Sequence, residues 1–196
     1  MLKKHLANFD IILASGSPRR HHFFKELDIH FKIDVREIKE QFPEHLKAQE
    51  ITNYLAQLKA NEFKNIKENQ IVITSDTIVW KDNSAIGKPK HKIDAIKMLQ
   101  GLSGETHKVF TSVCFSTKHN QITVYDCTKV QFKKLSKEEI AYYLDTYEPY
   151  DKAGSYGIQD WIGYVGIEKI EGCFFNVMGL PTRLVYKTLL EIVNSK

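Results

Sequence analysis

The sequence predicts an α/β fold with a mixed β-sheet flanked by helices. Strand-like and helix-like hydrophobic patterns alternate along its 196 residues. Several of the helix-like segments begin at residues that favour helix starts. Two long strand-like runs, 109–115 and 121–132, are separated only by a polar turn, which predicts an antiparallel pair. Because there is no internal repeat and no Pro/Gly/Ser-rich linker, we expect one domain over residues 1–196.

The first half of the chain is predicted to contain three strands and two helices. A short apolar run, 11–14, predicts a buried strand, and Pro18 fits the first turn of the helix that follows. Apolar and polar residues alternate over 29–35, as in a strand. Apolar residues at helical spacing predict a helix over 49–63, and the apolar run 71–80 predicts the third strand.

The second half is predicted to contain the antiparallel pair and three helices. A short helix is expected over 94–99. Ser136 and Glu139 have the spacing of a capping box, which predicts a helix that continues through Leu144. Pro181 is expected at the first position of a last helix, where apolar residues recur at helical spacing.

The composition is that of a globular protein, with 42% hydrophobic and 27% charged residues. A net charge of +4, without a basic stripe of interleaved aromatic residues, argues against a nucleic-acid partner. Three cysteines without CxxC spacing favour a reducing compartment, and the histidines lack zinc-ligand spacing. The N-terminus does not read as a signal peptide, and no apolar stretch approaches transmembrane length. We therefore expect a cytoplasmic protein without a membrane partner.

A turn rich in anion-binding groups follows the first predicted strand. It begins at Ser15, and Gly16 lets a ligand approach the backbone closely. Ser17 is placed to cap the next helix, whose unpaired N–H groups and dipole favour an anion. Arg19 and Arg20 add donors suited to phosphate, although arginine in a first helical turn opposes the dipole. The pattern favours a phosphate site over a capped helix with two surface arginines, and it is not a P-loop.

Asp76 lies inside the apolar run of the third strand, IVITSDTIVW. A buried carboxylate is costly unless it is paired, hydrogen-bonded or bound to a metal ion. It can hold a divalent cation or activate a water molecule. The alternative is an aspartate at a strand end that caps a turn, and the residue pattern alone leaves both interpretations open.

Other charged candidates are less distinctive. Lys59 and Lys152 have the residue type of ordinary solvated surface, whereas Lys88 lies in a turn between a glycine and a proline. Glu37 and Glu40 are candidate second ligands for a cation, although most such residues are plain surface charges.

The polar loop 148–159 contains glycines, aromatic residues and an amide. Tyr156 offers an aromatic surface on which a base could stack, and Gln159 offers a donor and an acceptor for its edge. The alternative is a long connection between a helix and a strand, which composition alone favours.

Taken together, these motifs resemble the Maf family of nucleotide pyrophosphatases over residues 13 to about 186. The motifs are LASGSPRR (13–20), YLAQLKA (54–60), SDTIVW (75–80), GKP (87–89), LSGETHKVFTSV (102–113), EPYDKAGSYGIQ (148–159) and NVMGLP (176–181). The resemblance implies a curved mixed sheet split into two lobes around a cleft, similar to inosine triphosphate pyrophosphatases. It also implies cleavage of a nucleoside triphosphate to the monophosphate and pyrophosphate, with Mg²⁺ or Mn²⁺.

The resemblance assigns roles to individual residues. Asp76 matches the proposed general base and, with a glutamate such as Glu40, would hold the cation. The phosphate-contacting positions correspond to Ser15, Arg19, Arg20, Lys59 and Lys88, and the positions that tune base choice to Arg19, Thr77 and Gln159. The segment AGSYGIQ resembles the branch that acts on dTTP and UTP, but Asp160 stands where that branch commonly has glycine. A short gap in the match would exchange Glu40 for Glu37.

Three alternatives remain at this point. The enzyme could be a broader house-cleaning hydrolase of non-standard purine triphosphates. It could also be a nucleotide-binding regulator of cell division with little hydrolysis, although such a protein would have little use for Asp76, Lys59 and Lys88 together. A nucleic-acid-binding module is the third. We expect a small-molecule nucleotide as the partner, and the oligomeric state, with a homodimer as one option, stays open.

Overall fold

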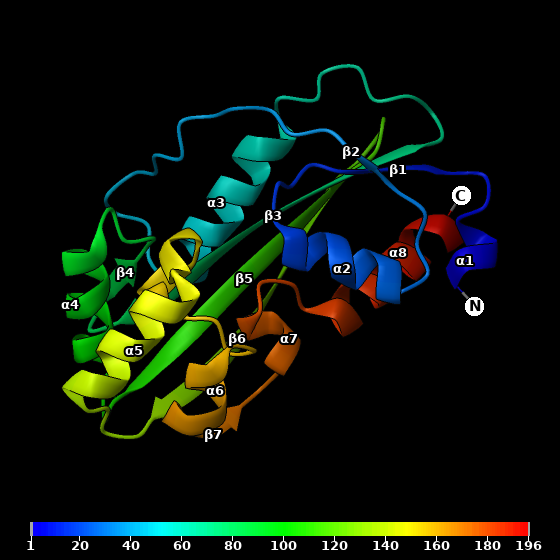
Figure 1. The fold of residues 1–196 in the computed structure, drawn as a ribbon. Helices are drawn as coiled ribbons and strands as arrows, with labels where there is room; N and C mark the ends of the chain where they lie inside the picture. Colours follow the sequence, from blue (N-terminus) through cyan, green and yellow to red (C-terminus); the bar gives the residue numbers. More distant parts are fainter. Residues whose placement is uncertain (1, 196) are drawn as a thin grey trace.

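The computed structural model describes residues 2–195, which form a mixed seven-stranded sheet flanked by helices (Figure 1). The sheet order is β2-β1-β3-β5-β6-β7, with β4 paired to one end of β3. β1 is parallel to β2 and β3, and all other pairs are antiparallel. The predicted α/β class is confirmed.

The strands are β1 (Asp10–Leu13), β2 (Lys32–Ile33), β3 (Gln70–Lys81), β4 (Ser84–Ile86), β5 (Thr106–Ser116), β6 (Gln121–Phe132) and β7 (Ile167–Glu171). The α-helices are α1 (Leu2–His5), α2 (Pro18–Glu26), α3 (Gln49–Ala60), α4 (Lys92–Leu102), α5 (Lys137–Tyr147), α6 (Trp161–Gly166), α7 (Phe174–Val177) and α8 (Thr182–Asn194), and two 3₁₀ turns are η1 (Pro149–Asp151) and η2 (Ala153–Ser155). None of these helices is long and apolar enough to cross a bilayer.

Most predicted elements are present with shifted ends. β5 and β6 form the predicted antiparallel pair, and Ser136 and Glu139 make the predicted capping box at the start of α5. Two details of the helix starts were wrong. Pro181 lies at the N-cap of α8 instead of its first helical position. Ser17 occupies the N-cap of α2, but its side chain makes no capping hydrogen bond.

The strand predicted over 29–35 is the largest error, because only Lys32–Ile33 is paired. This segment lies at the sheet edge, where its partner β1 is only four residues long. Ile33 and Val35 are about half exposed, so the alternating pattern did not mark a buried face. The short elements α1, β4, α6, β7 and α7 have no predicted counterpart, since few residues give no readable period.

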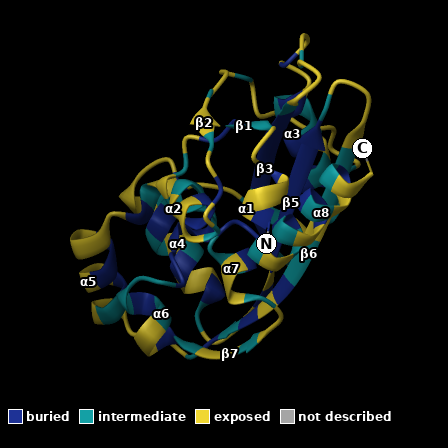
Figure 2. Cartoon of the chain, turned by 90° about the vertical axis from the view of Figure 1, so that its right-hand side faces the viewer, coloured by how far each residue is buried: buried dark blue, intermediate teal, exposed yellow. Residues whose placement is uncertain are grey.

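The core is divided between two ends and two faces of the sheet. At one end, α1, α2 and α8 pack on the sheet through residues such as Phe24 and Leu189. At the other end, α4 and α5 bury Leu99 and Tyr143. The helix α3 packs on the face of the sheet opposite to these two groups of helices. β3 contributes to the core on both faces, because successive side chains of a strand point to opposite faces. Figure 2 shows β3 and β5 as mainly buried strands inside this shell.

The edge of β3 is open in its middle. β1 ends opposite Ile73, and β4, which runs antiparallel to β3, ends opposite Val79. Within residues 2–195, no strand pairs with this edge over 74–78, whereas β5 pairs along the other edge throughout. Polar groups from the turn after β1 and the segment after β4 can therefore reach the centre of the sheet. This interruption, a switch from a parallel to an antiparallel neighbour, creates the room for a site.

His107 of β5 lies in the core and makes the stability of the fold depend on pH. Its Nε2 shares a hydrogen bond of 2.7 Å with the Tyr156 hydroxyl, and Nδ1 has no partner in the described chain. Burial, helped by the charge of Lys81, lowers the pKa of His107 to about 4. An unfolded chain would bind this proton near pH 6.5. We expect the free energy of unfolding to fall as pH drops from 6.5 to 4, with His107 contributing about 3 kcal/mol of the loss.

Urea unfolding of wild type and His107→Gln at several pH values between 4 and 7.5 measures this contribution. The variant should lose less stability than wild type at low pH. His30→Gln, which changes an exposed histidine, is the control and should keep the wild-type dependence. Equal pH dependence in wild type and His107→Gln would contradict a buried neutral imidazole.

Candidate active site

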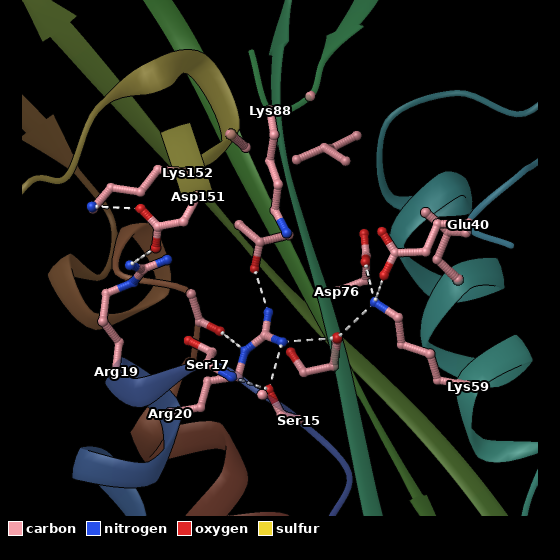
Figure 3. Close-up of a pocket in the computed structure, with 18 of the residues that line it drawn as sticks. Ser15, Ser17, Arg19, Arg20, Glu40, Lys59, Asp76, Lys88, Asp151 and Lys152 are labelled. Atoms are coloured by element: carbon pink, nitrogen blue, oxygen red, sulfur yellow. Dashed lines mark hydrogen bonds and ion pairs between the residues drawn. The ribbon is translucent and has the colours of Figure 1, made fainter. Parts of the chain in front are cut away.

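The open stretch of β3 borders a cavity of about 870 Å³. The lining carries six basic and four acidic side chains, an excess of positive charge that suits a polyphosphate. Figure 3 shows that the labelled side chains converge on this space from several elements. All the predicted site residues line the cavity: Ser15, Ser17, Arg19, Arg20, Glu40, Lys59, Asp76, Thr77, Lys88 and Gln159.

Two carboxylates meet at one ammonium group in the cavity. Lys59 Nζ, from α3, lies 2.7 Å from Asp76 Oδ1 and 2.8 Å from Glu40 Oε1 (Figure 3). Glu40 comes from the irregular segment between β2 and α3. Glu37 also lines the cavity, but it is Glu40 whose carboxylate contacts Lys59.

The charges of this group perturb one another. Burial raises the pKa of Asp76 above its ordinary value, and the ammonium of Lys59 opposes that rise. Burial acts in the same direction on Glu40, but the hydrogen bond from Lys59 and the nearby cations lower the pKa of Glu40 overall. The raised pKa suits Asp76 to accept a proton, whereas the lowered pKa favours the charged form of Glu40.

The two carboxylates also fit a hard divalent cation. Mg²⁺ in nucleotide enzymes is commonly held by one or two carboxylates together with phosphate oxygens of the substrate. Asp76 and Glu40 offer such a pair in the same cavity as the segment 15–20, which was predicted to bind phosphate. In the described residues, no cluster of three histidine, cysteine or acidic side chains is suited to a metal ion. A cation held by these two carboxylates would complete its ligands with oxygens from water or from the substrate.

Arg20 is the structural centre of the site. Its guanidinium donates to the main-chain oxygens of Ser75 (3.0 Å) and Gly179 (2.8 Å), and to the hydroxyls of Thr77 (3.0 Å) and Ser15 (3.3 Å). Ser75 belongs to the open edge of β3, so Arg20 satisfies a carbonyl that no neighbouring strand pairs. Burial lowers the pKa of Arg20 to about 10, which leaves it charged at neutral pH.

The structure shows contacts of two residues near Arg20 that the sequence did not indicate. Thr77, for which a role in base choice stays a prediction, has its hydroxyl engaged by Arg20 and Thr111, both at 3.0 Å. It therefore holds the arginine in place. His21 was not predicted at all, although its ring nitrogen lies 2.5 Å from the main-chain oxygen of Ser15. Its only sequence signal was its position in the first turn of α2.

Arg19 forms a bridge across the cavity. Its Nη1 lies 2.9 Å from Asp151 Oδ2 in η1, and Lys152 Nζ contacts the other oxygen of Asp151 at 2.8 Å (Figure 3). Burial tends to raise the pKa of Asp151, but its hydrogen bonds with Lys152 and Arg19 lower it overall. Asp151 was not predicted as a site residue, since nothing local indicates a partner 132 positions away.

Lys88 is the cation best placed to meet a ligand. It follows β4, and its side chain points toward Asp76 and Arg20 in Figure 3. Within residues 2–195, its ammonium group is in no hydrogen bond or ion pair. The turn predicted around Lys88 is absent, because residues 87–89 form an irregular segment after β4. This segment presents an uncommitted positive charge to the cavity.

Tyr156 does not have the predicted role of a stacking surface. Only 5% of the residue is exposed, and its ring packs edge-on against His107 and Phe132. Burial also raises the pKa of its hydroxyl, which is hydrogen-bonded to His107. Tyr156 therefore anchors the loop to the core, and little of its ring face is available to a base.

Comparisons with known proteins identify related sequences and a related fold. The chain is 55% identical over 194 residues to the dTTP/UTP pyrophosphatase of Flavobacterium johnsoniae, covering 98% of this chain and 100% of that protein. It is 56% identical over 196 residues to the dTTP/UTP pyrophosphatase of Christiangramia forsetii, covering 100% of both. The fold resembles that of a HAM1 protein from Coxiella burnetii, with a TM-score of 0.52 at 14% identity over 93% of this chain and 99% of that one.

A family model described as Maf-like protein matches residues 10–192. This range includes every residue that lines the cavity, from Ala14 to Gly179. With the family model and both full-length relatives in agreement, the chain belongs to the Maf-like protein family.

Proposed function

We propose that this protein is a nucleoside triphosphate pyrophosphatase that acts on dTTP and UTP. The observation that carries the proposal is a buried carboxylate, Asp76, at the open edge of β3 inside a cavity with excess positive charge. The names of the two relatives support the same substrates. Removal of these nucleotides would serve as house-cleaning of the nucleotide pool.

The proposed reaction is hydrolysis at the α-phosphorus. The oxygen of a water molecule forms a bond to that phosphorus, and the bond to the oxygen that bridges the α- and β-phosphates breaks. Pyrophosphate leaves with that oxygen, and Asp76 accepts a proton from the water. Arg20, Lys59 and Lys88 place positive charge around the phosphates, which stabilises charge that develops on their oxygens.

Asp76 and Glu40 would hold a divalent cation, Mg²⁺ or Mn²⁺, which neutralises phosphate charge when bound. Without substrate, Lys59 balances both carboxylates and allows two like charges to lie close together. With substrate bound, the same ammonium group would also attract the negative charge of the phosphates.

A panel of nucleotides tests the proposed substrate. We expect pyrophosphate release from dTTP and UTP at a catalytic efficiency far above that for ATP, GTP and CTP, because mismatched polar groups at a base edge discriminate strongly. Pyrophosphate and monophosphate are both measured, to separate this cleavage from removal of the terminal phosphate. A best substrate among non-standard purine triphosphates would replace the base assignment, and binding without hydrolysis would indicate a regulator.

Chelation tests the cation and identifies its glutamate. We expect excess chelator to stop hydrolysis and Mg²⁺ or Mn²⁺ to restore it. Glu40→Gln should raise the Mg²⁺ concentration needed for half-maximal activity by about tenfold, since one of two carboxylate ligands is lost. Glu37→Gln is the matched control, because it also lines the cavity, and should change this concentration little. Full activity in chelator, or a larger effect of Glu37→Gln, would contradict the assignment.

A further inference from the structure

Behind Gln159 lies a chain of hydrogen bonds that the proposed reaction does not use. The main-chain N–H of Gly157 donates to the Tyr143 hydroxyl at 2.9 Å. Tyr143 donates to Asp160 Oδ2 at 2.8 Å, and Gln159 Nε2 donates to Asp160 Oδ1 at 2.9 Å. Lys152 Nζ lies 3.8 Å from the same carboxylate. This series of hydrogen bonds connects the buried side of α5 to the cavity wall, where Gln159 lies.

The direction of each hydrogen bond follows from its chemistry. A main-chain N–H can only donate, so the Tyr143 oxygen accepts from Gly157 and its own hydrogen goes to Asp160. Burial raises the pKa of Tyr143, which keeps that hydrogen in place. An ionised carboxylate only accepts, so the nitrogen of the Gln159 amide, and not its oxygen, must face Asp160.

Gly157 provides the room for this arrangement. A Cβ atom at this position would lie 2.5 Å from Asp160 Oδ2 and 2.7 Å from Gln159 Nε2. Any larger residue would push the carboxylate and the amide apart. The glycine is therefore required by the packing of this network.

This orientation of the amide leaves its oxygen as a hydrogen-bond acceptor that no described residue uses. Gln159 Oε1 is buried and has no hydrogen-bond partner among the residues described. A buried carbonyl without a partner is unfavourable, so a donor from a bound ligand would be stabilised there. One hydrogen of Nε2 is taken by Asp160, and the second remains for an acceptor on the ligand.

We propose that Asp160 is a positioning residue that selects the base by holding the Gln159 amide in one orientation. The amide then accepts from a base that carries a ring N–H, as uracil and thymine do at N3. Cytosine has the same size but presents an acceptor at N3, which would face the Gln159 oxygen. This inference rests on the proposed function, and it predicts a preference for UTP over CTP that the shape of a pocket alone cannot provide.

Asp160→Asn tests the inference, because asparagine can donate as well as accept and lets the Gln159 amide turn over. Asp160→Ala, which removes the acceptor, is a second variant with the same expected direction. Asp145→Asn makes the same chemical change on the surface, where Asp145 pairs with Lys92, and is the control. Circular dichroism and thermal unfolding establish that each variant is folded. Either folded Asp160 variant suffices for the test.

The readout is the ratio of kcat/KM for UTP to kcat/KM for CTP. We expect each Asp160 variant to lower this ratio by about tenfold or more, mainly through a higher KM for UTP, and Asp145→Asn to leave it unchanged. A uniform loss on both substrates, or an unchanged ratio, would overturn the inference and leave the proposed function standing. Wild-type protein that hydrolyses no nucleoside triphosphate would overturn both.

Discussion

Asp76→Asn is expected to lower turnover by on the order of a hundredfold or more, because it removes a general base and a cation ligand in one change. The substitution should not destabilise the fold. Burial raises the pKa of Asp76, so the ionised carboxylate costs folding free energy at neutral pH, and the neutral amide avoids that cost. Lys59 keeps Glu40 as a partner. We therefore expect an inactive protein with an equal or higher unfolding midpoint.

Steady-state hydrolysis of dTTP and thermal unfolding are measured together on the same preparation. Asp145→Asn removes an exposed carboxylate and should keep full activity. Near wild-type turnover in folded Asp76→Asn would exclude its proposed role. A strong loss of stability would instead mean that Asp76 is a structural partner of Lys59.

Arg20→Ala is expected to reduce kcat/KM for the triphosphate by about ten- to a hundredfold and also to destabilise the protein. A charge-assisted contact contributes about 1.5–3 kcal/mol, and this arginine also holds Ser75, Thr77 and Gly179 in place. Without the guanidinium, the Ser75 carbonyl at the open edge of β3 loses a partner. Both effects therefore come from one side chain.

Lys88→Ala separates the two effects. Its ammonium group has no partner in the described structure, so the unfolding midpoint should stay within error while kcat/KM falls by about tenfold. Lys90→Ala, which removes an exposed lysine two positions away, is the control for charge. Unchanged affinity and rate in both Arg20→Ala and Lys88→Ala would place the anion site elsewhere.

The α/β class and the order of the main elements could be predicted from the amino-acid pattern alone. Periodicity identified α3, β3 and the pair β5–β6, because each is long enough to repeat its pattern. Local chemistry also singled out the segment before α2 and the carboxylate of Asp76, both of which line the cavity. A helix start rich in anion-binding groups and an acid in an apolar strand are visible without knowledge of a partner.

The contacts between side chains that are distant in the sequence became visible only in the folded protein. Glu40, and not Glu37, lies beside Lys59. The sequence could not settle this choice, because the segment between β2 and α3 has no regular secondary structure from which the direction of a side chain could be predicted. Arg19 likewise pairs with Asp151, and Tyr156 is buried against His107. The open edge of β3 depends on where β1 and β4 end along it, which is a property of strand register. Periodicity records which face a residue occupies within its own element, and long-range contacts arise only when those elements pack.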